Sequence, residues 1–319
     1  MTRDIKIMWI VLAALCVVPF MLNSPLFLME VLCYALFACA FNLLLGYAGL
    51  LSFGHAAFFG SAGYIAGYVL INFKSWTGVA LDPLLGILVG TAFSALLGFL
   101  FGSLAIRRAG IYFAMITLGL AEIIAYLANQ LPFTNGENGL VGIPRGTLFG
   151  LLDLSSEKAM YFFVLAIFAC GFWLVYRTVH SPFGQILKAI RENESRAISL
   201  GYNVQKFKLM AFVLSAALSG TAGATKSMVM GIQGLTDVHW HVSGDVILMT
   251  LLGGLGTIFG PAVGAAIISS LHHFSSALEG WVTVILGVTF IFCVLVFRRG
   301  VVGEISAFFK SCDKSESNA

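Results

Sequence analysis

Long apolar segments recur along the whole chain, and the short stretches between them hold most of the charged residues. Eight continuous segments lie at 7–22, 26–45, 56–73, 84–106, 110–131, 159–176, 209–230 and 281–297. Runs of about 18 or more apolar residues are long enough to cross a bilayer as helices. A further apolar segment, 246–275, is broken near its centre by four glycines and Pro261. The pattern predicts an all-α polytopic membrane protein with about 8–10 spans, counting Gly-broken or re-entrant segments.

Composition agrees with a single transmembrane domain over residues 1–319. Of the 319 residues, 59% are hydrophobic and 10% are charged, whereas soluble domains carry about 25% charged residues. The six cysteines include no C-x-x-C pair, so we expect no metal site built on them. We expect a lipid bilayer around the chain and no nucleic-acid partner. The N-terminal apolar run lacks a small-residue cleavage site and is predicted to be an uncleaved first span.

The distribution of Lys and Arg predicts the orientation. Fourteen of the 18 lie at the N-terminus, at 107–108, at 177–208, at 298–299 and in the tail. Because short cytoplasmic loops collect these residues, both termini, the loop 177–208 and the tail 298–319 are predicted to be cytoplasmic. Segment 246–275 must then enter and leave by one face or cross twice. Lys226, near a membrane end, is expected to extend its side chain toward the interface.

Two Gly-rich strings resemble each other: LLGYAGLLSFGHA (44–56) and LLGGLGTIFGPA (251–262). Paired Gly-interrupted segments in two halves of a chain indicate the central pathway of a transporter, although two Gly- and Leu-rich strings can also match by chance. Glu122 lies in the middle of a span, where a carboxylate needs protein or water around it. It either serves the pathway or is hydrogen-bonded between helices. The predicted pathway residues are Asn42, Gly46, Gly49, Gly54, His55, Thr117, Glu122, Gly253, Gly254 and Gly256.

Three other motifs do not predict a catalytic or metal site. GTAGATKS (220–227) has Thr225 where a nucleotide-binding loop has its second glycine, and it ends an apolar helix instead of following a strand. Ser61 lies beside glycine and six residues after His55, but no positioned base supports a nucleophile. The histidines at 239, 241, 272 and 273 have no cysteine or carboxylate cluster to complete a metal site.

The loop between the sixth and seventh segments has helical periodicity. One apolar stripe among charged neighbours is formed by Phe183, Ile186, Leu187, Ile190, Ala197 and Ile198. Gly201 is placed to end the helix. The pattern predicts one amphipathic helix over 183–200, whose apolar face is covered by a partner protein or by lipid.

The chain resembles the LivM-type permease subunits of branched-chain amino-acid ABC importers over nearly its whole length. The matching strings include NLLLGYAGLLSFGHAAFFGSAGY, YFAMITLGLAEI, FTNGENGLVGIP, LLGGLGTIFGPAVGA and the stretch 181–224, which runs from the cytoplasmic loop into the next span. In that family the loop is the segment that couples to the ATPase, loosely related to an E-A-A-x-x-x-G pattern. Glu194 and Gly201 lie seven positions apart, one more than in that pattern, and Ser195 and Arg196 replace the two alanines.

The resemblance implies a bacterial inner-membrane complex. Its other members would be a homologous second permease subunit, two ATPase subunits and a periplasmic substrate-binding protein. This chain would hold no cofactor, because ATP and Mg²⁺ bind the ATPases, and it would not itself be an enzyme. The expected cargo is a branched-chain or other hydrophobic amino acid. Two alternatives stay open: a permease for urea or short amides, and an ion-coupled secondary transporter that uses Glu122.

Overall fold

The computed structural model describes residues 25–77, 81–108, 110–148, 150 and 152–275, with isolated positions between 8 and 16 and between 284 and 303. The helices are α2 Leu26–Asn42, α3 His55–Thr77, α4 Pro83–Ala105, α5 Ile111–Gln130, α6 Glu157–His180, α7 Pro182–Glu192, α8 Glu194–Ser199, α9 Val204–Met230, α10 Trp240–Gly253 and α11 Gly260–Ser275. A π-helix, η1 Leu43–Ala48, directly extends α2. The short elements are η2 Pro132–Thr134, η3 Gly136–Asn138, η4 Leu235–Asp237, β1 Leu140–Val141, β2 Thr147–Leu148, β3 Leu152–Asp153 and β4 Ile232–Gln233.

Six of the described helices are long and apolar enough to span a membrane: α2 with η1, α3, α4, α5, α6 and α9. They confirm six of the eight continuous spans expected from the sequence. The expected spans at 7–22 and 281–297, and the tail at 298–319, fall outside the described residues except at isolated positions.

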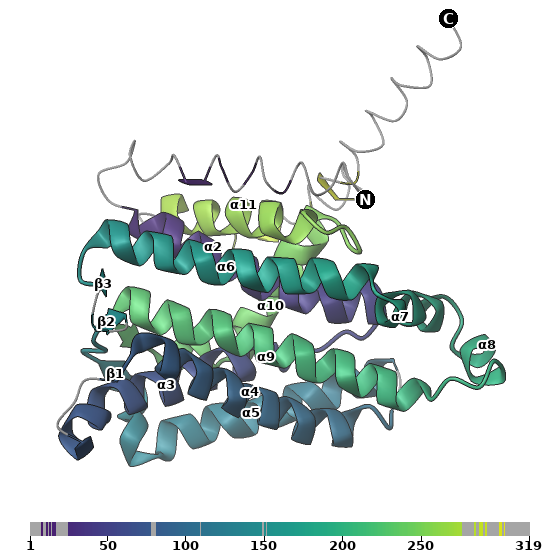
Figure 1. The fold of residues 1–319 in the computed structure, drawn as a ribbon. Coiled ribbons are helices and arrows are strands. Elements are labelled where there is room, and N and C mark those ends of the chain that lie inside the picture. Colours follow the sequence, from purple (N-terminus) through teal and green to yellow (C-terminus); the bar gives the residue numbers. More distant parts are fainter. Residues whose placement is uncertain are drawn as a thin grey trace, which may run out of the picture.

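Helix α9 lies at the centre of the bundle (Figure 1). It packs on α4, α3 and α2, with α2, α6 and α11 on one side and α3, α4 and α5 on the other. Two short antiparallel pairs, β1 with β4 and β2 with β3, lie at one end. We call this end of the bundle the strand end. Helices α7 and α8 lie at the opposite end, which we call the α7 end.

Local sequence signals begin and end these helices. Asp82 caps α4 by accepting a hydrogen bond from the amide of Leu84 at 2.9 Å, and Pro83 occupies the first turn, where its missing N–H costs nothing. Ser156 caps α6 in the same way through the amide of Ala159.

Segment 246–275 belongs to a helical hairpin. Helix α10 runs from the strand end toward the α7 end, and α11 returns beside it. At their crossing, a Cβ added to Gly260 would lie 2.7 Å from the Gly253 carbonyl oxygen, so only glycine permits this approach. With 14 and 16 residues, the two helices are about 21 and 24 Å long. The segment therefore enters and leaves at the same end. This agrees with the expectation drawn from the cytoplasmic placement of the basic stretches 177–208 and 298–299 on either side of it.

Two expectations were wrong. Residues 183–200 form two helices, because Asn193 adopts an extended backbone (φ −156°) and its side chain caps α8 through the amide of Arg196 at 3.0 Å. Lys226 does not extend to the interface. It is buried with 8% of its surface exposed, because Asp237 lies within reach inside the fold.

Candidate functional site

The two Gly-rich strings meet in space at the α7 end. Asn42, the last residue of α2, is buried and donates from Nδ2 to the Thr257 carbonyl at 2.8 Å. Its Oδ1 accepts a hydrogen bond from the Gly256 amide at 3.1 Å. A Cβ added to Gly46 would lie 2.8 Å from the Gly256 nitrogen. One buried amide side chain thus joins the break after α2 to the turn of the α10–α11 hairpin, which we name the break junction.

Glycine is required where the chain leaves each helix. Gly49 ends η1 with φ +71°, and Gly254 follows α10 with φ +119°. Both values lie in the region that a side chain disfavours. Gly253 is the last residue of α10, and Gly256 lies in the turn with φ +73°. The predicted glycines of the two strings are therefore located at two helix breaks that pack on each other.

Helix α7 contacts the break junction directly. The Arg191 guanidinium donates from Nη1 to the carbonyl of Gly46. Its aliphatic stem packs beside Gly49, where an added Cβ would lie 3.0 Å from Cγ. The ammonium of Lys188 lies 5.5 Å from the centre of the Tyr47 ring. Two basic side chains of α7 thus hold the π-helix, whose irregular turn leaves a carbonyl free to accept from Arg191.

The apolar stripe of α7 and α8 is covered by this chain itself. Leu187, Ile190 and Ala197 are 0%, 3% and 2% exposed. Phe183 and Ile186 are half-buried, and Phe183 stacks on Phe207 of α9. The expectation that this stripe is open to a partner or to lipid is therefore wrong except at Ile198, because the start of α9 and the π-helix η1 already cover the rest.

The exposed apolar residues of this region lie at the end of α8 and just beyond it. Ile198, Leu200 and Tyr202 are 58%, 69% and 41% exposed. We name these three residues the elbow patch. Sequence periodicity did not identify Leu200 and Tyr202. Both follow the last residue of α8, so they do not share the helical spacing of its apolar stripe.

Glu194 and Gly201 fix the position of α8. Glu194 forms an ion pair with Lys208 of α9 at 2.8 Å. Gly201 has φ +87°; its amide bonds to the Ile198 carbonyl at 2.9 Å, and the Tyr202 amide bonds to the Ala197 carbonyl at 3.2 Å. This is a Schellman motif, and it confirms that Gly201 ends the helix.

His55 is a buried structural residue. It is fully buried at the start of α3, and its Nε2 lies 2.9 Å from Ser215 Oγ. Ser215 donates its own proton to the Ala40 carbonyl at 2.6 Å, so the imidazole must donate to Ser215 and cannot accept its proton. This pair is therefore not a nucleophile and base. Ser61, the serine weighed from the sequence, does not bond to His55 in the described structure.

Thr117 is also buried, and it holds the loop between η1 and α3. Its Oγ1 donates to the Ala114 carbonyl at 2.9 Å and accepts from the Phe53 amide at 3.2 Å. A Cβ at Gly54 would lie 2.8 Å from the Thr117 carbonyl oxygen. The structure therefore brings Gly54 and Thr117 together by direct packing.

Glu122 lies apart from these residues, on the exposed face of α5. Met115, Gly119 and Tyr126 share that face at helical spacing and are also exposed. At the α7 end of the same helix, an apolar cavity of about 440 Å³ separates α5 from the loop at Gly49. Its other lining residues are Leu50, Leu51, Phe53, Gly110, Ile111, Phe113, Ala114, Met115 and Leu118.

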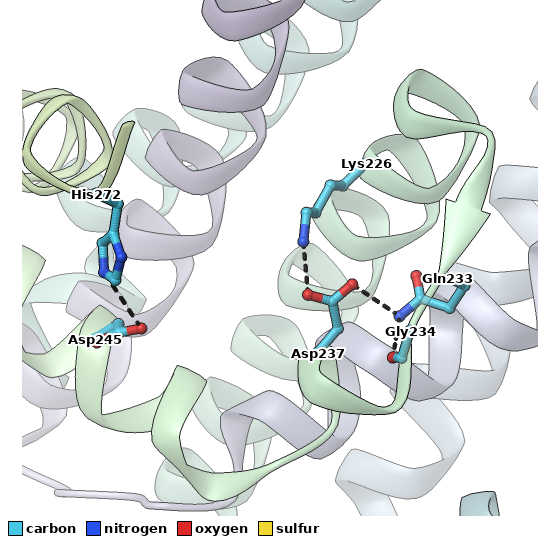
Figure 2. Close-up of polar contacts among 6 residues, drawn as sticks. All are labelled: Lys226, Gln233, Gly234, Asp237, Asp245 and His272. Carbon is cyan, nitrogen blue, oxygen red and sulfur yellow. Dashed lines mark hydrogen bonds and ion pairs between the residues drawn. The ribbon is translucent and has the colours of Figure 1, made fainter. Parts of the chain in front are cut away.

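Sequence reasoning missed a buried ionic cluster at the strand end (Figure 2). Lys226 Nζ lies 2.6 Å from Asp237 Oδ1, and Gln233 donates to Asp237 Oδ2 at 3.2 Å. The rings of Tyr34 and Phe59 lie 5.2 and 5.7 Å from the Lys226 ammonium. The available signal was a lysine at the end of an apolar helix with an aspartate eleven residues later.

Within the described part of the chain, no group of three His, Cys, Asp or Glu residues is placed to hold a metal ion. GTAGATKS lies inside α9, where its amides are engaged in the helix. The fold therefore defines the chain as a polytopic helical membrane protein. Its two helix breaks contact each other, and the amphipathic helix α7 contacts them.

The chain belongs to the family of branched-chain amino acid transport system permease components, whose model matches residues 26–295. This is a family of transport permeases, in agreement with the resemblance found in the sequence. Among similar proteins, the high-affinity branched-chain amino acid transport permease LivM of Salmonella typhimurium is 27% identical over 74% of this chain and 59% of its own length. LivM of Escherichia coli gives the same values.

The LivH permease of Salmonella typhimurium is 23% identical over 85% of this chain and 91% of its own length. The chain spans about 59% of the length of the two LivM proteins. No solved structure matches the chain.

Proposed function

We propose that this chain is the transmembrane permease subunit of an ATP-driven importer of branched-chain or other hydrophobic amino acids in a bacterial inner membrane. It acts with a second, homologous permease subunit, two ATPase subunits that bind ATP and Mg²⁺, and a periplasmic binding protein. Family membership supports this proposal, as do the names of the LivM and LivH relatives. The α7 end is cytoplasmic in this proposal, because it carries the basic loop 177–208.

The observation that carries the proposal is the contact of α7 with the break junction. An ATPase that displaces α7 would pull on Gly46 through Arg191 and on Gly256 through Asn42. The junction includes two helix ends and a π-turn, which deform at lower cost than a continuous helix. Motion at α7 is thus transmitted to α2 and to the α10–α11 hairpin without passing through a flexible loop.

The elbow patch is the proposed ATPase contact. Its three apolar side chains project from the α7 end, beyond the spanning helices, and buried apolar anchors contribute most of the affinity at protein interfaces. Leu187 and Ile190, which face the membrane domain, position α7 and do not touch the ATPase.

The exposed face of α5 is the proposed pathway, shared with the second permease subunit. Glu122 lies on that face, where an ionised carboxylate requires water or a protein partner. The apolar cavity at the α7 end of α5 suits a hydrophobic side chain on its way to the cytoplasm. Glu122→Gln is expected to lower uptake; unchanged uptake and ATP hydrolysis would assign Glu122 a structural role.

The experiment is affinity purification of the chain from its native membrane in mild detergent, with the copurifying proteins identified and quantified by mass spectrometry. Wild type is expected to retain two ATPases and a second permease. Ile198→Asp and Leu200→Asp are expected to lower ATPase recovery about tenfold each, equivalent to about 1.4 kcal/mol. Leu152→Asp, an equally exposed leucine at the strand end, is the matched control and should retain the ATPases.

Two results would contradict the proposal. If the wild-type chain purifies alone and transports on an ion gradient, it is a secondary transporter. If both elbow variants recover ATPases at wild-type level, the elbow patch is not the contact.

A further inference from the structure

A second cavity lies at the strand end, between α2 and the α10–α11 hairpin. Its volume is about 260 Å³, smaller than the pockets that hold drug-sized ligands. We name it the strand-end cavity. It is lined by Glu30, Tyr34, Asp245, Met249, Ser269, His272 and His273. It is separate from the α5 face and from the apolar cavity at the α7 end, so the proposed transport pathway does not use it.

Two carboxylates face the cavity. Glu30 and Asp245 both line it, and the described ion pairs include none at Glu30. The nearby Lys226 is already paired with Asp237, and its ammonium lies 5.2 Å from the centre of the Tyr34 ring. Asp245 Oδ2 lies 3.8 Å from His272 Nε2, which is too far for a hydrogen bond and is an ion pair only when the imidazole is protonated (Figure 2).

Two further polar atoms point to a ligand in the cavity. Ser269 is only 7% exposed, and its Oγ has no hydrogen-bond partner among the described residues. The Nε2 atom of His272 is buried and also lacks a hydrogen bond to any described residue. Buried polar groups in proteins are nearly always hydrogen-bonded. A hydroxyl, an imidazole nitrogen and two carboxylates that line one cavity therefore form an incomplete set of acceptors.

The chemistry of this set selects the ligand. Divalent cations such as Ca²⁺ and Mg²⁺ take six or more oxygen ligands in a compact shell, and no metal-binding group is found among the described residues. A neutral imidazole nitrogen accepts a hydrogen from an N–H donor. A primary ammonium carries one positive charge and three such donors, and its hydrogen bonds to carboxylates are charge-assisted and strong. We propose that the strand-end cavity binds the primary ammonium group of a small solute.

The probe is radiolabelled methylammonium, which carries the ammonium and almost nothing else. Binding is measured by scintillation proximity on the full-length chain, purified in detergent with its native partners, at constant ionic strength and without ATP. We expect saturable binding to wild type. Glu30→Gln and Asp245→Asn should each weaken it at least tenfold, and Ser269→Ala at least threefold. Asp153→Asn, which removes an exposed carboxylate of β3, is the matched control and should bind as wild type does.

Competition on the wild-type protein keeps the test independent of whether a variant folds. Unlabelled methylammonium should displace the probe, whereas tetramethylammonium, with the same charge and no N–H group, should not. The proposal is overturned if wild type shows no saturable binding, if tetramethylammonium competes equally, or if Asp245→Asn binds like wild type. None of these outcomes depends on ATPase partners or on the cargo, so they are distinguishable from a failure of the proposed function.

Discussion

Breaking the buried ion pair between Lys226 and Asp237 should destabilise the protein more than removing both charges. The two side chains are 11% and 12% exposed and lie 2.6 Å apart. At an effective dielectric constant of 20 their attraction is about 6 kcal/mol, which largely offsets the several kcal/mol needed to desolvate each ion. The pair as a whole therefore contributes little net stability, but each charge depends strongly on the other.

Asp237→Leu leaves the buried Lys226 ammonium without its carboxylate partner, and Lys226→Met leaves the carboxylate with Gln233 as its side-chain donor among the described residues. Each single substitution should cost about 3–5 kcal/mol, whereas the double variant should cost less than either. Since 1 kcal/mol corresponds to about 2–4 °C for chains of 150–250 residues, each single variant should melt roughly 6–20 °C lower.

The assay is the apparent melting temperature of the detergent-solubilised chain, read by fluorescence-detected size exclusion after heating. Lys206→Met, which removes an exposed cation from the same helix, is the control and should stay within about 0.5 kcal/mol of wild type. Single variants that melt like wild type would refute the reasoning. So would a double variant whose loss equals the sum of the two single losses.

Three further substitutions test other contacts by the same thermal assay. Asn42→Ala removes the hydrogen bonds to Gly256 and Thr257 and should cost about 2–6 kcal/mol; wild-type stability would mean that the break junction does not depend on this amide. Thr117→Val keeps the shape but leaves the Phe53 amide without its acceptor, at a cost of about 1–3 kcal/mol; no loss would show that water replaces the hydroxyl. Gly201→Val forces a β-branched residue to φ +87° and should cost about 1–3 kcal/mol. ATPase recovery should also fall, because Leu200 and Tyr202 shift. A variant that equals wild type in both stability and ATPase recovery would contradict this.

The apolar pattern alone determined the class of protein. Six spans were located to within a few residues because helices in a bilayer must satisfy their own backbone hydrogen bonds over about 20 apolar residues. The glycine at 201 was identified as a helix end because its requirement for positive φ is local. The charge pattern also required segment 246–275 to return to its starting side, and the hairpin does so.

Only the tertiary structure decided what those segments contact. Helical periodicity showed that α7 has an apolar face, but a period cannot say whether this chain or a partner covers it, and the start of α9 covers it. The local preference of Asn193 for capping ended the helix early. Three contacts join residues that are distant in the sequence. Lys226 pairs with Asp237 across 11 positions, Asn42 with Gly256 across 214, and Arg191 with Gly46 across 145. These contacts depend on how helices pack, and hydrophobic periodicity records only which face of a helix is buried, not the neighbour that buries it.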